Sequence, residues 1–284
     1  MTIFQSESTS TLRDFVDVEF SRRLEMAETA TPELIKALKR FTGEATAAVF
    51  GGGTAVFGGK SYPSNQIVGM GLYGRVTGVE LDRVEEFYRS RGVPSRIVVS
   101  PLADASLMQL LGTRGYGVVE FNSVLIRRLD DVALQEPAAG VTVERVSAES
   151  APVWDSVIRQ GYAELAVIPE GMFLPFAELA ESTNFLAYVD GAPAGGAMGG
   201  ILRDARIGAL YGSSTLPAWR GRGVQTALIN RRLWEVRQAG CEYAVVCTFP
   251  GSGSQRNMER RGFRLAYTKV VMVRNWPEAQ SNET

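Results

Sequence analysis

The spacing of hydrophobic residues divides the chain into two halves with a similar order of helices and strands. In the first half, apolar side chains recur every three or four residues from Leu12 to Leu24, which predicts a helix. Thr31, Pro32 and Glu33 are typical of the cap and first turn of a second helix. Apolar runs then predict strands at residues 46–50, 54–57, 66–73, 96–99 and 116–127, with helices around 84–88 and 107–111. The glycine tract at 51–53 predicts a hairpin turn between the first two strands.

The second half follows the same alternation. Its apolar runs predict strands at 141–146, 185–189, 194–202, 206–215, 242–247 and 263–274, and helices at 151–165, at 224–236 and near Arg256. Between the halves, residues 130–140 contain Pro137 and several small side chains, which is typical of a linker. We therefore predict two domains, at residues 1–134 and 140–276, followed by a disordered polar tail from Pro277.

Short matches between the halves favour a duplication. Arg114-Gly115-Tyr116 precedes Arg261-Gly262-Phe263 by 147 positions, and the same offset relates Val98-Val99 to Val245-Val246. Chance matching of short apolar runs is the alternative explanation. The shared order of predicted elements favours duplication, because repeated architecture preserves order as well as local sequence.

The two copies differ in length at one place. A second match, at an offset of 138, relates Leu72-Tyr73-Gly74 to Leu210-Tyr211-Gly212. Counted from the last glycine of each match, Gly92 follows after 18 positions and Gly240 after 28. Most of the missing ten residues then correspond to residues 216–223, so we expect the first copy to keep the scaffold and to lack this loop.

Composition narrows the possible chemistry. The chain has no histidine and only two cysteines, Cys241 and Cys247, which excludes histidine-dependent triads and argues against a zinc site held by the protein. Both thiols fall in one apparent strand, residues 241–248, roughly 20 Å apart, too far for a disulfide within that strand. We interpret Cys247 as a buried, inert thiol, since no histidine is available to activate it as a nucleophile.

A segment between a strand and a helix carries the strongest chemical signal. It contains Arg220-Gly221-Arg222-Gly223 after Pro217 and before a patterned helix that starts at Val224. Glycines let the backbone approach a ligand closely, and a helix N-terminus offers free N–H groups and a positive dipole end to a phosphate. A polar surface turn is the alternative interpretation. The proline that ends the strand and the helix that follows favour a phosphate site.

This segment resembles the acyl-CoA signature of the GNAT superfamily of N-acetyltransferases, in which Arg or Gln is followed at set spacing by Gly and by Gly or Ala. Here Arg220 and Gly223 occupy the first two of these positions. The run from Asn257 to Phe263 resembles the family's second hallmark, a short helix that leads into Gly-Phe. The resemblance covers about residues 141–274, and much of the first half shows a degenerate form of it. It implies a mixed α/β fold: two GNAT-like domains, each a twisted mixed sheet flanked by helices, with two splayed central strands that admit the pantetheine arm.

Three positions depart from the family pattern. Gln225 stands where glycine or alanine is usual, Met258 where many members have a thiolate-protonating tyrosine, and Gly251 where an asparagine is frequent. Many relatives place a carboxylate base on the central strand, but residues 207–214 contain none. Tyr211 and Tyr267 are then the candidate catalytic residues, with simple packing of a strand aromatic as the alternative for each.

The resemblance implies an acyltransferase that uses acetyl-CoA as acyl donor and moves the acyl group directly to an amine of a small molecule. The unpaired thiols fit a cytoplasmic location. The alternative is a non-catalytic CoA-binding pseudo-enzyme that acts as a sensor or a partner-binding module. The residues expected to bind acetyl-CoA are Ser213, Thr215, Leu216, Arg220, Gly221, Arg222, Gly223, Val224, Gln225, Thr226, Ser254 and Asn257.

The other expectations concern partners. Formal net charge is −1, so we expect neither nucleic acid nor a membrane as a partner. The absence of histidine leads us to expect no metal. The acceptor is expected to be a small-molecule amine. Residues 170–181, with Met172, Phe173 and Phe176, either line an apolar acceptor pocket or pack in the core. The sequence leaves the oligomeric state open, a homodimer included.

Overall fold

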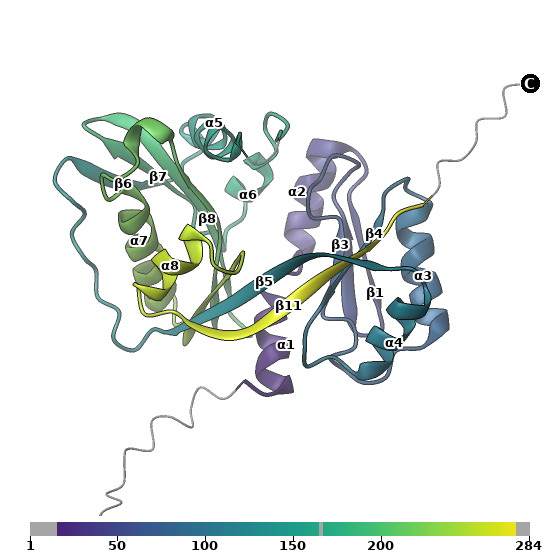
Figure 1. Ribbon diagram of the computed structural model, residues 1–284. Helices are drawn as coiled ribbons and strands as arrows, with labels where there is room; N and C mark the ends of the chain where they lie inside the picture. Colours follow the sequence, from purple (N-terminus) through teal and green to yellow (C-terminus); the bar gives the residue numbers. More distant parts are fainter. Residues whose placement is uncertain (1–15, 165–166, 277–284) are drawn as a thin grey trace, which may run out of the picture.

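One mixed sheet of eleven strands runs through both halves of the protein, as the computed structural model shows for residues 16–164 and 167–276 (Figure 1). Its order is β1-β2-β3-β4-β11-β5-β10-β9-β8-β7-β6. The strands are β1 (Thr46–Phe50), β2 (Gly53–Phe57), β3 (Gln66–Val68), β4 (Ser95–Val99), β5 (Gly117–Arg128), β6 (Val141–Arg145), β7 (Phe185–Val189), β8 (Ala192–Leu202), β9 (Ile207–Thr215), β10 (Tyr243–Thr248) and β11 (Arg264–Arg274).

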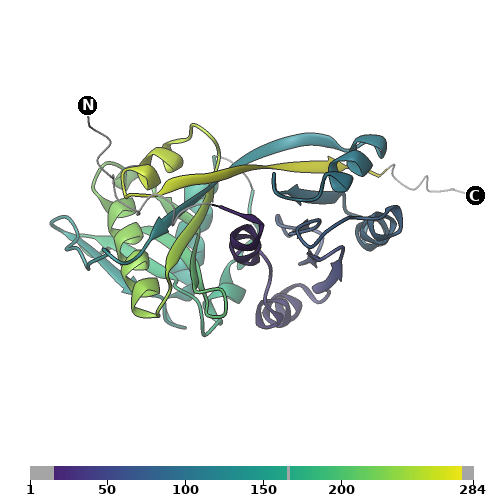
Figure 2. The same ribbon diagram turned by 90° about the horizontal axis from the view of Figure 1, so that it is seen from below.

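Helices cover this sheet on both halves, and one of them lies between the halves. They are α1 (Val18–Met26), α2 (Pro32–Thr42), α3 (Gly78–Arg89), α4 (Ala105–Thr113), α5 (Ala151–Tyr162), α6 (Leu174–Ala177), α7 (Val224–Gln238) and α8 (Gly253–Glu259). Figure 2 shows α1 below the long strands β5 and β11, where these cross from one half to the other. Among the described helices, none is both long enough and apolar enough to cross a membrane.

The two halves exchange their closing strands. β11, the last strand of the second half, pairs with β4 of the first half, whereas β5, the last strand of the first half, pairs with β10 of the second. β5 and β11 also pair with each other, and their register sets Asn122 opposite Lys269. These two residues are 147 positions apart, the offset of the sequence repeat, so the pseudo-twofold relation between the halves passes through this pair. The pattern of apolar residues does not predict this exchange.

Most predicted elements are present, with differences at their ends. The predicted hairpin is confirmed, and Gly51 and Gly52 both have positive φ angles, as its tight turn requires. The predicted strand at 66–73 is too long, since β3 ends at Val68 where Gly69 enters the left-handed region with φ +82°. The first helix begins at Val18, after an Asp17 cap; Leu12 and Phe15 lie outside the described residues, as do Leu165 and the tail from Pro277.

Helix α7 packs tightly on the strand that precedes it in the chain. A Cβ added at the buried Gly208 of β9 would lie 2.4 Å from Cβ of Val236 in α7. Real Cβ atoms essentially never approach another atom so closely, so helix and strand must move apart to accept a larger residue. The glycine therefore sets how closely α7 can pack against β9.

We expect Gly208→Ala to lower the free energy of unfolding by about 1–3 kcal/mol, the usual cost of overpacking a tight core. Urea unfolding followed by circular dichroism measures this change. Gly117→Ala is the matched control, because Gly117 also lies in a strand and has no atom within 4 Å of the added Cβ. Equal stability of the two variants would contradict the close contact between α7 and β9.

Candidate active site

The parallel strands β9 and β10 separate at one end of the sheet. Their ladder pairs residues 207–209 with 243–245, after which β9 continues to Thr215 and β10 to Thr248. Within the described chain, the hydroxyls of Ser213, Thr215 and Thr248 are buried near this opening and have no hydrogen-bond partner. Buried polar atoms are normally satisfied, so these hydroxyls are available to a ligand that enters the opening.

A bulge in β9 lies on the other edge of this strand. Ala197 of β8 pairs with Ser213, but Gly199 pairs with Leu210, which leaves one extra residue on β9. The fully buried guanidinium of Arg232, from α7, fills the gap and donates hydrogen bonds to the carbonyls of Met198 (2.9 Å) and Tyr211 (3.2 Å). Burial lowers the pKa of Arg232 to about 10, so the group stays charged at neutral pH.

The contact with Arg232 also orients one backbone donor. The Tyr211–Gly212 peptide bond is trans, so the N–H of Gly212 points opposite to the Tyr211 carbonyl. Because Arg232 bonds that carbonyl from the side of α7 and β8, the N–H of Gly212 points away from Arg232. A donor held in this way can stabilise negative charge that develops on a nearby oxygen.

The loop after β9 ends at an uncapped helix. Gly221 and Gly223 have φ angles of +78° and +83°, a region that favours glycine, and Gly223 is the N-cap of α7 without a side-chain capping bond. The first N–H groups of α7 therefore lack the side-chain acceptor that usually satisfies them. Arg220 and Arg222 flank the loop, half exposed, and face carboxylates at 3.6 Å and 3.3 Å.

Helix α8 closes this side of the opening. Asn257 donates a hydrogen bond of 2.6 Å to Gln225, and Arg261 donates one of 3.1 Å to Thr226. Val224 is buried in the core, and the Leu216 N–H bonds to β8. The predicted acetyl-CoA residues thus gather on three neighbouring pieces of chain: the end of β9 (Ser213, Thr215, Leu216), the loop and first turn of α7 (Arg220, Gly221, Arg222, Gly223, Val224, Gln225, Thr226), and α8 (Ser254, Asn257).

The equivalent place in the first half is built differently. Helix α3 starts with a capping box, in which Thr77 and Glu80 satisfy each other's backbone N–H groups. Glu80 places a carboxylate where a phosphate would have to bind. The expectation that the first half lacks the loop is wrong: nine residues (69–77) connect β3 to α3, and eight (216–223) connect β9 to α7. The first half is shorter because β3 and α3 are shorter than β9 and α7.

A cavity of about 530 Å³ extends from the opening toward the first half. Ser213, Gln225 and Ser254 line the side near α7 and α8. The connection from α1 to α2, residues 62–64 and Gln66 line the side of the first half. Met172, Phe173 and Phe176, for which the sequence left pocket and core both open, also line it. Among the described residues that line the cavity, three are glutamates (Glu28, Glu33, Glu181) and none is lysine or arginine.

A buried charged cluster adjoins this cavity. Lys269 of β11 is 2% exposed and donates hydrogen bonds to Glu25 (3.0 Å) and Glu28 (2.7 Å), which lie at the end of α1. Burial acts to raise the pKa of both carboxyls and Lys269 acts to lower it; the pKa of Glu25 ends above its ordinary value and that of Glu28 below it. The Cys247 thiol donates a hydrogen bond to Glu28, and burial raises the pKa of this thiol.

The two candidate catalytic tyrosines lie in different surroundings. Tyr211 lines the cavity, and its hydroxyl donates a hydrogen bond of 2.7 Å to the carbonyl of Ala27. Tyr267 is buried in the charged cluster, where its hydroxyl donates to Glu25 at 2.6 Å. Burial raises the pKa of both hydroxyls, so neither ionises at neutral pH. Their catalytic role stays a prediction.

Comparison with known families gives this arrangement a name. Residues 153–263, which contain the opening, the glycine loop and α8, match the model of the acetyltransferase (GNAT) family. This stretch of the second half is similar to a GNAT domain. The resemblance inferred from the loop and from the Gly-Phe ending is therefore confirmed. No curated protein matches the sequence.

Solved structures extend the likeness to both halves. A GCN5-related N-acetyltransferase from Kribbella flavida has a TM-score of 0.64 at 20% identity, over 90% of this chain and 96% of that one. A tandem GNAT protein from the clavulanic acid biosynthesis pathway has a TM-score of 0.61 at 13% identity, over 92% and 95%. A GCN5-related N-acetyltransferase from Sphaerobacter thermophilus has a TM-score of 0.53 at 17% identity. The match covers 69% of this chain and 64% of the length of that protein. The mixed α/β fold in a tandem GNAT arrangement is thus confirmed.

Sequence reasoning missed the charged cluster beside the GNAT domain's opening. One signal was readable. Tyr267, Lys269 and Val271 alternate along β11 on one face, and an inward-facing lysine between two apolar positions requires a buried partner. Glu25 and Glu28 gave no such signal, because nothing in the local pattern of α1 places them against β11.

Proposed function

We propose that this protein is an acetyl-CoA-dependent N-acetyltransferase whose GNAT domain moves an acetyl group to an amine of a small molecule. The observation that carries this proposal is the uncapped start of α7 beside the strand opening. It combines unsatisfied helix N–H groups, two left-handed glycines and the unpartnered hydroxyls of Ser213 and Thr215. These groups suit an anionic, amide-containing ligand.

Residues of the chain fit such a ligand piece by piece. The first turn of α7 would bind the pyrophosphate, with Arg220 and Arg222 as flanking cations. Ser213, Thr215 and Thr248 would hydrogen-bond the polar groups of the arm between β9 and β10. Acetyl-CoA supplies, when bound, an acetyl group activated as a thioester. The N–H of Gly212, next to the Tyr211 carbonyl that Arg232 holds, would be a donor for the carbonyl oxygen as it gains charge, and one such donor contributes roughly 3 kcal/mol.

The acceptor side of the cavity supports direct transfer to an amine. It is continuous with the opening, and its charged lining residues are carboxylates. Holding an amine and a thioester in contact accounts for a large part of the rate acceleration of acyl transfer. We further propose a cytoplasmic location, which the two free cysteines support. Partners other than the small-molecule acceptor are not needed for this chemistry.

Calorimetric titration of acetyl-CoA into the full chain tests the proposal. We expect one site per chain, because Glu80 and Thr77 cap the corresponding helix of the first half. A ligand at 100 times its dissociation constant should also stabilise the fold by about 2.7 kcal/mol, which thermal unfolding detects. Two sites per chain would contradict the assignment to the second half, and no binding would overturn the proposed function.

A panel of primary amines then separates the enzyme from its alternative. Release of CoA thiol in the presence of an amine indicates transfer. Binding of acetyl-CoA without turnover of any amine would favour the non-catalytic CoA-binding module. The observation that supports this alternative is Met258, which stands where many family members have a tyrosine that protonates the thiolate. Met258 is buried, with 2% exposure, and has no proton to donate.

A further inference from the structure

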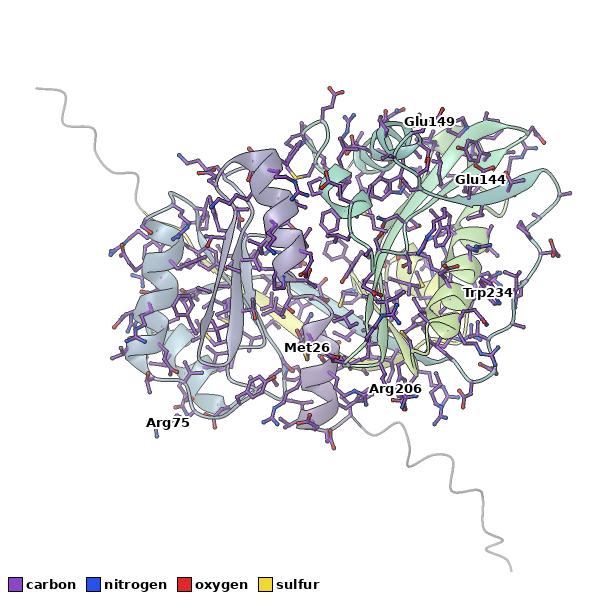
Figure 3. All side chains as sticks on the ribbon, turned by 180° about the vertical axis from the view of Figure 1, so that it is seen from behind. Met26, Arg75, Glu144, Glu149, Arg206 and Trp234 are labelled. Carbon is purple, nitrogen blue, oxygen red and sulfur yellow. The ribbon has the colours of Figure 1, made fainter. Side chains whose placement is uncertain are left out.

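The end of α1, which belongs to the first half, lies across the opening of the GNAT domain. Tyr211 of β9 donates a hydrogen bond to the carbonyl of Ala27, and Cys247 of β10 donates one to Glu28. The helix end is therefore bonded to both strands that separate. In Figure 3, Met26 marks this end of α1 between the two halves.

This helix end carries an excess of negative charge. Each oxygen of Glu25 accepts one hydrogen bond, from Tyr267 and Lys269, and each oxygen of Glu28 accepts one, from Cys247 and Lys269. Two carboxylates thus share a single ammonium. The aligned peptide dipoles of α1 add partial negative charge at its C-terminal end. A further cation is therefore favoured beside this cluster.

Glu28 is the member of the cluster that a ligand can reach. Its side chain is 23% exposed and lines the cavity, whereas Glu25 is 3% exposed and does not. No lysine or arginine is present among the described lining residues to neutralise it from the cavity side. Glu28 therefore offers an ionised carboxylate to whatever occupies the acceptor side.

The remaining walls define the body of this ligand. Met172, Phe173, Phe176 and Leu179 of the second half and Tyr62 of the first half face the cavity. Burial raises the pKa of Tyr62 to about 12, so its hydroxyl adds no charge at neutral pH. Apolar walls beside the carboxylate of Glu28 suit a ligand that has a cationic group and an apolar body.

We propose that Glu28 is the anchor for the ammonium group of the acceptor, and that the acceptor is a primary amine with an apolar body, held between the two halves. This inference rests on the proposed function, which it deepens by naming the acceptor class. Lys269 acts as a positioning residue, because it touches Glu28 and Glu25 and does not line the cavity.

The test measures binding of phenethylamine to the full chain by calorimetry, with and without CoA. We expect Glu28→Gln to weaken binding by about 10- to 100-fold, the usual effect of losing a charge-assisted hydrogen bond. Glu149→Gln is the control: Glu149 is exposed and is not among the residues that line the cavity, so its variant should bind within about 2-fold of the wild type. The neutral analogue 2-phenylethanol should bind the wild type at least 10-fold more weakly than the amine.

Folding of the variant is controlled separately. The amide oxygen that Glu28→Gln introduces can still accept a hydrogen bond from Lys269 or from Cys247, and Glu28→Asp keeps the charge with a shorter reach. We expect the aspartate variant to recover part of the lost affinity. A glutamine variant with wild-type thermal stability and wild-type amine affinity would overturn the inference, as would a wild type that binds the alcohol as well as the amine, or neither.

The two proposals fail in different ways. Acetyl-CoA binding without any amine binding would overturn the acceptor site and leave the proposed donor site intact. Amine binding that depends on Glu28, in a protein that does not bind acetyl-CoA, would support the ammonium site and overturn the proposed acyl transfer.

Discussion

Gly223→Glu should weaken acetyl-CoA binding at least 100-fold. Gly223 is the N-cap of α7 and has a φ of +83°, so the backbone is strained when any other residue stands there. Its side chain would lie at the start of the helix. Glutamate also puts a negative charge where the pyrophosphate is proposed to bind. Two like charges about 4 Å apart repel by roughly 4 kcal/mol near a protein surface. This energy exceeds the approximately 2.7 kcal/mol that a 100-fold change requires. Calorimetry with acetyl-CoA measures it.

Gly240→Glu is the matched control for this change. Gly240 follows the other end of α7, also has a positive φ, of +85°, and has no atom within 4 Å of an added Cβ. Its variant has a comparable backbone strain and the same added charge, but at the far end of the helix. We expect wild-type affinity for acetyl-CoA. Equal losses in both variants would mean that strain in α7, not charge at its start, controls binding, and would remove the loop from the proposed site.

The neighbourhood of this loop was predictable because its signals are local. Pro217 stops a strand, two glycines permit the left-handed turn, and a patterned helix begins at Val224. Each of these signals depends on residues within a few positions of each other. The predicted strand at 206–215 and helix at 224–236 accordingly differ from β9 and α7 by only one or two residues at an end.

The exchange of β5 and β11 was not predictable for a physical reason. The two strands are the corresponding members of a repeat, with the same offset of 147 and similar apolar patterns. The pattern of apolar residues therefore does not decide which half of the sheet each strand completes. Strand pairing is decided by contacts between distant residues, which a pattern along the chain does not record.

Arg232 shows the same limit at a single residue. Its position in α7 is compatible with a solvated helix face, and sequence alone cannot reveal the bulge that receives it. The cost of burying the guanidinium is offset in part by two strand carbonyls, Met198 and Tyr211, which lie far away in the chain. The Gly212 donor is thus arranged by a tertiary contact, and only the loop proposed to bind the cofactor is encoded locally.

The strand exchange also brings Lys269 of the second half beside α1 of the first, and this contact should dominate the stability of the junction. We expect Lys269→Met to lower the free energy of unfolding by about 3–5 kcal/mol at pH 7, because it leaves the carboxylate of Glu25 buried without a cation. Urea unfolding measures the change. Lys36→Met, at an exposed position of α2, is the control and should change stability by less than about 0.5 kcal/mol.

The pH dependence distinguishes this explanation from simple loss of packing. In the wild type, Lys269 acts to lower the pKa of both Glu25 and Glu28. Without it, burial raises both folded-state pKa values above those of the unfolded chain, so the folded variant binds protons more readily as the pH falls. The difference in stability between wild type and variant should therefore shrink between pH 7 and pH 5. Adding Glu25→Gln to Lys269→Met should recover part of the loss at pH 7. A difference that is independent of pH, and that Glu25→Gln does not reduce, would mean that Lys269 contributes only the packing of its side chain.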